Sequence, residues 1–132
     1  MSAWGTGSFE NDDAADWVYE LEESSGTDAV EAALEAIDPD DYPEAPDCNV
    51  AIAAAEVIAA LRGHPLESLP AEVAAWVDEN ETDIDSDLVA LALTAIQRIE
   101  SDSELKELWN DADELDSWSD ALRDLESRLN AS

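Results

Sequence analysis

Apolar residues recur every three or four positions along most of the chain, in blocks separated by acidic residues. This spacing is typical of helices with one buried face, and no useful stretch alternates apolar and polar residues as a half-buried strand does. Asn, Asp, Ser or Thr precedes most blocks, and Gly or Pro follows several of them. The pattern predicts an all-α fold, a single compact domain of six or seven helices over residues 1–132 with an ordered, non-helical arm at residues 1–11.

Two helices are expected in the N-terminal third. Asn11 or Asp12 can cap the first, and the acidic residues near its start suit the helix dipole. Thr27 can cap the second, which stops before Pro39 because the residue ahead of a proline disfavours helical geometry. The inward-facing residues are expected to be Ala14, Trp17, Val18 and Leu21 in the first helix, and Val30, Ala33, Leu34 and Ile37 in the second.

Residues 38–47 are predicted to form a crossing loop, because three prolines and five acids fall within them. Asp47 is then expected to cap an Ala-rich helix over residues 48–62, and Gly63 to end it in the left-handed conformation. Apolar residues occur all round this helix. It is therefore predicted to be central and buried.

Two apolar blocks follow the central helix. Pro70 fits the first turn of a helix that runs to about residue 80. Asp85 or Ser86 can cap the next helix, in which apolar residues hold the helical period as far as Ile99.

The stretch 104–129 allows either one long helix or two, because apolar residues recur through it without Gly or Pro. A break near residues 111–116 is favoured, since Asn, Asp and Ser compete there with helical hydrogen bonds. Ser117 with Asp120 resembles a capping box for the second helix.

The charge of the chain narrows the classes of partner. Five Lys and Arg stand against 35 Asp and Glu, a formal net charge of −30. Such a surface repels phosphate backbones and anionic lipid headgroups, so neither nucleic acid nor membrane is expected as a direct partner. The expected partners are an unidentified protein, together with monovalent cations at the acidic surface.

The kind of basic residue suggests the solvent. Four of the five are Arg, and Lys106 is the single Lys. An acid excess with so little Lys is typical of proteins from organisms that accumulate salt. At molar salt the Debye length falls to about 3 Å, which removes most of the self-repulsion, while salt strengthens apolar association. The chain is therefore predicted to be halophilic, and to need molar KCl or NaCl to fold.

The N-terminal residues have no basic stretch, twin arginine or apolar run of the kind found in export signals. The longest apolar stretches, 50–55 and 57–61, are interrupted by Glu56 and are too short to span a bilayer. A cytoplasmic location is expected.

The opening Trp4-Gly5-x-Gly7-x-Phe9-x-Asn11-Asp12 resembles that of the prokaryotic domain-of-unknown-function family 4259. The similarity continues at residues 45–48, 53–61, 103–109 and Trp118, and so covers most of the chain. Ser2 stands where the family usually has glycine. The resemblance implies a small helical domain and brings no established activity with it.

Glu56 is the most notable candidate, because it is the single ionisable residue between Val50 and Leu61 of the predicted central helix. A carboxylate there must be exposed on a narrow face, paired or protonated. Its possible partners are Arg98, a Trp indole N–H, or backbone amides of the arm. A satisfied core acid that fixes helix register is favoured over a catalytic acid or base.

Six further residues are candidates for binding: Trp4, Asn11, Asp12, Asp16, Trp17 and Trp109. All but Trp109 belong to the arm and the first helix, which either plug the core or line a pocket. The acids at 12, 13 and 16, and those at 83, 85 and 87, are interpreted as solvated faces. The second set echoes a calcium loop but lacks its glycine and its final Glu. His64 and Cys48 are each the single residue of their kind, and neither a metal site nor a cofactor is predicted.

Three functional hypotheses remain. The first is a non-catalytic helical domain acting through protein contacts, at residues 38–47 or at an aromatic rim of Trp76, Trp109 and Trp118. The second is an acidic inhibitor or immunity-type protein that mimics nucleic acid. The third is a small enzyme that uses Glu56 with Asp16, and it is disfavoured.

Overall fold

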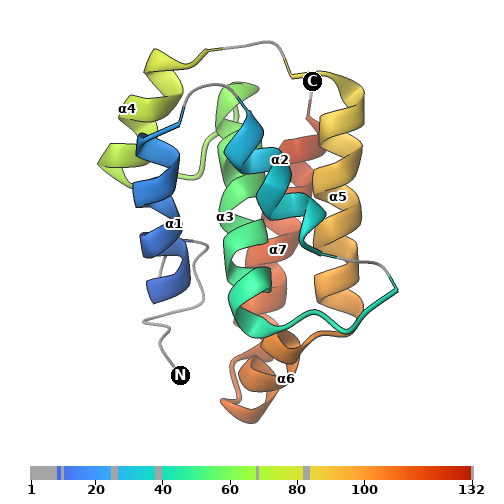
Figure 1. Cartoon of the computed structure of the whole chain (residues 1–132). Coiled ribbons are helices and arrows are strands. Elements are labelled where there is room, and N and C mark those ends of the chain that lie inside the picture. The colour runs from blue at the N-terminus through green and yellow to red at the C-terminus, as the bar shows by residue number, and fades with distance from the viewer. Residues whose placement is uncertain are drawn as a thin grey trace.

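A central helix, α3 (Ala45–Leu61), contacts each of the other helices, which surround it (Figure 1). The computed structural model describes residues 9, 11–24, 27–37, 40–67, 69–81 and 84–131. Within these ranges the fold is all-α and compact, as predicted, with seven helices and no strand. The other helices are α1 (Asp12–Glu22), α2 (Asp28–Glu35), α4 (Ala71–Glu79), α5 (Ser86–Ser101), α6 (Glu104–Asp111) and α7 (Leu115–Asn130).

Helix α3 is buried on all sides, as its apolar circumference predicts. Nearly every residue from Cys48 to Ala60 is buried, and Val50 is half-buried. Alanine supplies many of these positions, and small side chains allow neighbouring helix axes to approach closely. The centre of the domain is therefore an Ala-rich rod packed on all its faces.

The predicted loop at residues 38–47 is too long at its C-terminal end, because α3 already begins at Ala45. Pro46 lies in the first turn, where a missing N–H costs no helical hydrogen bond. The N-cap residue is Glu44, and the predicted cap Asp47 lies inside the helix. The first amide of the helix, which has no partner within it, is satisfied by another helix: Ala45 N–H donates to Glu104 Oε1 of α6 at 2.8 Å.

The other end of α3 follows the prediction. Gly63 has a φ of 91°, and its N–H donates to the Ala60 carbonyl at 3.0 Å. The next amide, that of His64, donates to the Ala59 carbonyl at 2.8 Å. Together these bonds form a Schellman motif, which requires a left-handed residue where glycine is least strained.

The predicted N-caps of α1 and α5 are confirmed. Asn11 Oδ1 accepts the Ala14 amide at 2.7 Å, and Asp85 Oδ1 accepts the Leu88 amide at 2.9 Å. Thr27 precedes α2 as expected, but its hydroxyl donates to Glu31 at 3.2 Å and makes no side-chain cap.

The predicted break in the C-terminal stretch is confirmed, but its predicted capping box is wrong. Helix α7 begins at Leu115 after the N-cap residue Glu114, so Ser117 lies inside it. The chain turns at Asp113, whose φ is 60°. The Glu114 amide donates to the Trp109 carbonyl at 3.1 Å, as in a second Schellman motif.

Asp113→Gly is expected to raise the free energy of unfolding by about 0.5–1 kcal/mol, because glycine adopts positive φ without a Cβ penalty. Urea denaturation in molar KCl measures the change. Asp113→Ala is the matched control, because it removes the same charge and keeps the Cβ. An equal gain from both variants would assign the effect to charge and contradict the backbone explanation.

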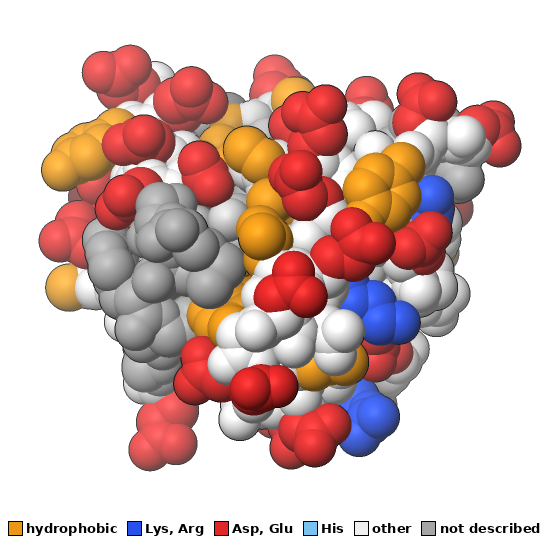
Figure 2. Space-filling model, turned by 90° about the horizontal axis from the view of Figure 1, so that it is seen from below, with side chains coloured by type: hydrophobic (Ala, Val, Ile, Leu, Met, Phe, Trp, Pro, Cys, Tyr) orange, Lys and Arg blue, Asp and Glu red, His pale blue; other side chains and the backbone are white. Residues whose placement is uncertain are grey.

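Acidic side chains are scattered over the described part of the face seen in Figure 2, whereas the basic ones gather on one side of it. Within the described ranges, no helix combines the length and the apolar character that a bilayer crossing requires.

Candidate functional site

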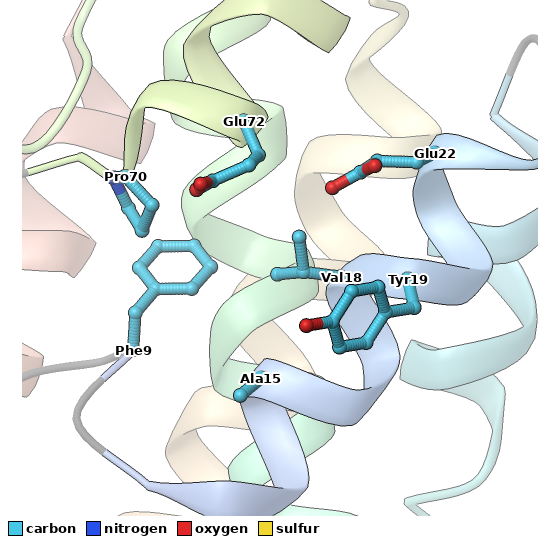
Figure 3. A pocket seen from close by; sticks show the side chains of 7 residues that line it. All are labelled: Phe9, Ala15, Val18, Tyr19, Glu22, Pro70 and Glu72. Carbon is cyan, nitrogen blue, oxygen red and sulfur yellow. The ribbon is translucent and has the colours of Figure 1, made fainter.

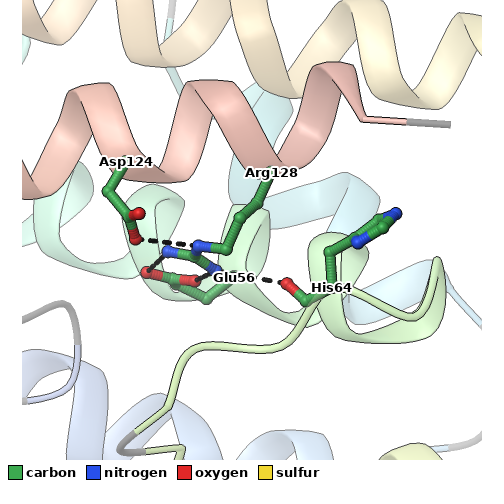
Figure 4. A network of polar contacts seen from close by, with 4 residues as sticks. All are labelled: Glu56, His64, Asp124 and Arg128. Atoms are coloured by element: carbon green, nitrogen blue, oxygen red, sulfur yellow. Dashed lines mark hydrogen bonds and ion pairs between the residues drawn. The ribbon is translucent and has the colours of Figure 1, made fainter.

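The Glu56 side chain, 1% exposed, faces α7 and is bound by Arg128. Arg128 Nη1 lies 2.6 Å from Glu56 Oε1, and Nη2 lies 3.1 Å from Oε2, so the pair is bidentate (Figure 4). The same guanidinium donates through Nε to Asp124 Oδ2 at 2.8 Å and through Nη1 to the His64 carbonyl at 3.4 Å. The cluster joins the middle of α3, its C-terminal turn and the end of α7.

This cluster has the chemistry of a structural cross-link. Burial lowers the pKa of Arg128, but its hydrogen bonds to Glu56 and Asp124 outweigh that effect and raise the pKa above its ordinary value. Arg128 therefore stays charged and holds both oxygens of a carboxylate that solvent barely reaches. A substrate has no free oxygen to approach.

Arg128, the partner of Glu56 among the described residues, is not Arg98, one of the partners proposed from the sequence. Arg98 instead donates to the carbonyls of Asp41 and Asp102, and so holds the chain before α3 against the end of α5. Arg128 lies 72 positions from Glu56 along the chain. Only the packing of α7 on α3 brings the two together.

The structure does not gather the described binding candidates into one site. Asn11 is buried and serves as a cap, Trp17 is in the core, and Asp12 and Asp16 are exposed on α1. Glu56 faces α7 instead of Asp16. Trp109 is buried on α6, and Trp4 lies outside the described residues.

The predicted aromatic rim is wrong. Trp76, Trp109 and Trp118 are 4%, 4% and 2% exposed, so each belongs to the core. The indole N–H of Trp76 donates to the Ser24 carbonyl at 3.0 Å, which satisfies its polar atom inside the fold. Each of the three lies on the inward stripe of its helix.

The chain ahead of α3 carries an exposed tyrosine that is held by α6. Tyr42 is 45% exposed, and its hydroxyl donates to the Glu107 carboxylate. This hydrogen bond, more than any other effect, raises the pKa of Tyr42 to about 12. Close by, burial raises the pKa of the Cys48 thiol to about 12, so that cysteine is inert.

A groove of about 260 Å³ opens between α1 and the start of α4 (Figure 3). It is lined by Phe9, Ala15, Val18, Tyr19, Glu22, Pro70 and Glu72. Tyr19 is 69% exposed, the most exposed large hydrophobic residue in the described part of the chain. The sequence analysis missed it, although an aromatic residue outside the apolar stripe of its helix was the available signal.

The groove combines aromatic rings with unpaired charge. The rings of Phe9 and Tyr19 lie on its two sides, and the carboxylates of Glu22 and Glu72 lie along one edge (Figure 3). Neither carboxylate makes a hydrogen bond or ion pair with another described residue. The groove therefore offers an apolar floor and an acidic rim to a molecule from outside.

A carboxyl pair joins α5 to α7 on another face. Burial and the hydrogen bond with Glu100 raise the pKa of Glu126 to about 7. Its proton is therefore held in the folded state at a pH where the unfolded chain has released it. The contribution of this pair to stability is present at acidic pH and falls as pH rises from about 4.5 to about 7.

Glu126→Gln replaces the carboxyl group with an amide of similar shape that is neutral at every pH. Relative to the unmodified protein, it should gain stability as pH rises from 5 to 8, when measured by urea denaturation in molar KCl. Glu79→Gln, an exposed residue of α4, is the charge-matched control. If both variants show the same pH dependence, the carboxyl pair is not its source.

Within the described residues, no group of three or more His, Cys, Asp or Glu side chains is arranged to hold a metal ion. Comparison with known families matches residues 2–121 to the family described as "Domain of unknown function (DUF4259)". The match ends within α7, ahead of Asp124 and Arg128. No curated protein and no solved structure matches the chain.

Proposed function

The chain belongs to the family described as a domain of unknown function (DUF4259), and because that description assigns no activity, we propose a function from the residues. The domain is a non-catalytic helical module that binds a protein partner in a cytoplasm of molar salt. Its contact surface is the groove between α1 and α4.

The exposed aromatic groove is the observation that carries this proposal. The other large apolar side chains of the described chain, apart from Tyr42, are buried or half-buried, while Tyr19 stands open beside Phe9. An open apolar patch rimmed by polar residues is typical of a protein interaction site. High salt strengthens apolar contacts and weakens charged ones, so such a patch suits a concentrated cytoplasm.

The state of Glu56 supports a module without catalytic chemistry. A general acid or base needs to reach the proton that it transfers. The Glu56 carboxylate is enclosed and held at both oxygens by Arg128, and that pairing supports a role in fixing the register of α3 against α7.

The distribution of charge supports adaptation to salt. The acids lie mostly at helix starts, connections and outer faces, where hydrated monovalent cations can neutralise them. A domain that mimicked nucleic acid would use the same acids to bind a basic enzyme, and molar salt would weaken that binding steeply.

Site-specific photo-crosslinking tests the contact surface. Benzoyl-phenylalanine replaces Tyr19 in one variant and Asp120 in the other, an exposed residue of α7 whose side chain is 75% exposed. In an extract of the source organism in molar KCl, a discrete protein adduct is expected from position 19 and none from position 120. Adducts from both positions, or adducts that form only at low salt, would favour the acidic mimic.

A further inference from the structure

We propose that the groove between α1 and α4 holds an arginine side chain of the protein partner. The inference rests on the proposed function and assigns the chemical group that the groove recognises. An arginine combines an apolar stem with a planar cation, and the groove combines an apolar floor with two carboxylates.

The shape of the groove fits the parts of an arginine. Ala15, Val18 and Pro70 supply an apolar surface for the aliphatic stem, since long cationic side chains pack their methylenes on such surfaces. The rings of Phe9 and Tyr19 offer faces on which a guanidinium stacks. Glu22 and Glu72 lie along one edge and can accept its N–H groups (Figure 3).

None of the basic side chains of this chain supplies a cation to the groove, so the cation must come from another molecule. All five are engaged elsewhere: Arg62 with the Ala131 carbonyl, Arg98 with that of Asp41, Lys106 with that of Ser101, Arg123 with Asp120, and Arg128 with Glu56. None of them lines the groove. No basic side chain of the chain therefore pairs with Glu22 or Glu72 beside this aromatic surface.

The solvent selects arginine over other cations. With a Debye length of about 3 Å at molar salt, charge attraction acts only between groups in contact. Lysine and K⁺ are compact and strongly hydrated, whereas the guanidinium is weakly hydrated and stacks on aromatic rings. Stacking and apolar contact survive in salt, so the groove discriminates by these terms.

Titration followed by ¹⁵N–¹H NMR in about 2 M KCl tests the assignment. The probe is N-acetyl-arginine methylamide, and the matched probes are the citrulline and lysine equivalents. Citrulline has nearly the same shape and no charge. Shifts are expected at the amides of residues 15–22 and 71–73, with binding of the arginine probe about fivefold or more tighter than that of the other two.

Variants separate the two parts of the site. Tyr19→Leu should weaken arginine binding about fivefold by removing the stacking face. Glu22→Gln with Glu72→Gln should narrow the preference for arginine over citrulline, and the share that comes from stacking on the aromatic rings should remain. Glu79→Gln, exposed on α4 outside the groove, is the charge-matched control and should bind as the unmodified protein does. All these positions are exposed, and circular dichroism checks that each variant folds.

Equal binding of arginine and citrulline to the unmodified protein would overturn the assignment. Nuclear Overhauser contacts between the Tyr19 ring and residues 1–8 would also overturn it, because the chain itself would then fill the groove. A crosslinked partner at position 19 without an arginine preference would overturn this inference and leave the proposed function standing. An arginine preference without any crosslinked protein would contradict the proposed function.

Discussion

Replacing Arg128 with methionine is expected to lower the free energy of unfolding by about 3–5 kcal/mol, because it leaves a buried carboxylate without its cation. Glu56 is 1% exposed, and both its oxygens accept hydrogen bonds from that guanidinium. The neighbouring Asp124 also loses its partner. Urea denaturation in molar KCl measures the loss without adding a denaturant that is itself a salt.

Arg123→Met is the matched control for this variant, because Arg123 lies on the same helix and its substitution removes the same charge. Its contact with Asp120 is 3.4 Å long between side chains that are 71% and 75% exposed, so it should cost less than about 1 kcal/mol. The double variant Glu56→Leu with Arg128→Met should recover most of the loss, because no charge remains buried. Equal losses for the two single variants would show that the buried pair does not fasten α7 to α3.

The helices could be predicted because each one repeats its apolar residues at the helical period. The stripes of α1 and α2, the all-round burial of α3 and the left-handed turn at Gly63 depend on neighbours within a few positions. The start of α3 could not be predicted in this way. Its first amide is capped by Glu104, which lies 59 positions further along the chain.

The C-terminal break shows the same limit in another form. The aspartates at residues 111–116, with Asn110 before them and Ser117 after them, correctly indicated that the helix is interrupted. The turn itself is made by Asp113 in a left-handed conformation, and aspartate adopts that conformation too seldom to mark it in a sequence. Ser117 with Asp120 had the right spacing for a capping box, but the helix had already begun.

The candidate site was predictable only in part. The lone acid in an apolar helix identified Glu56 as unusual, and the structure finds it buried. Its partner Arg128 could not be chosen from the sequence, because the choice depends on how α7 lies on α3. Tyr19 was overlooked, since a residue off the apolar stripe becomes a groove wall only when Phe9 and α4 are placed beside it.

The second large effect expected is the dependence of folding on salt. A net charge of −30 on a domain of 132 residues produces strong self-repulsion in dilute buffer. The five basic side chains all make hydrogen bonds or ion pairs within the fold, and five cations offset only a small part of the charge of 35 acids. The compact state is therefore expected to need mobile cations from the solvent.

Screening and general stabilisation by a co-solvent can be separated. Sucrose strengthens apolar burial by exclusion from the protein surface and screens no charge. If repulsion between acids is the cause, KCl restores the fold and an osmotically matched sucrose solution does so only weakly. Recovery of the fold by sucrose alone would identify marginal burial as the cause instead.

Whether the acidic surface is an adaptation to concentrated salt, and not a binding face for a basic partner, is tested most directly by circular dichroism at 222 nm during a KCl titration. The signal is expected to show little helix at about 50 mM KCl and to reach its full value only in the molar range, where the Debye length is about 3 Å. Full helix at about 50 mM KCl would contradict that adaptation.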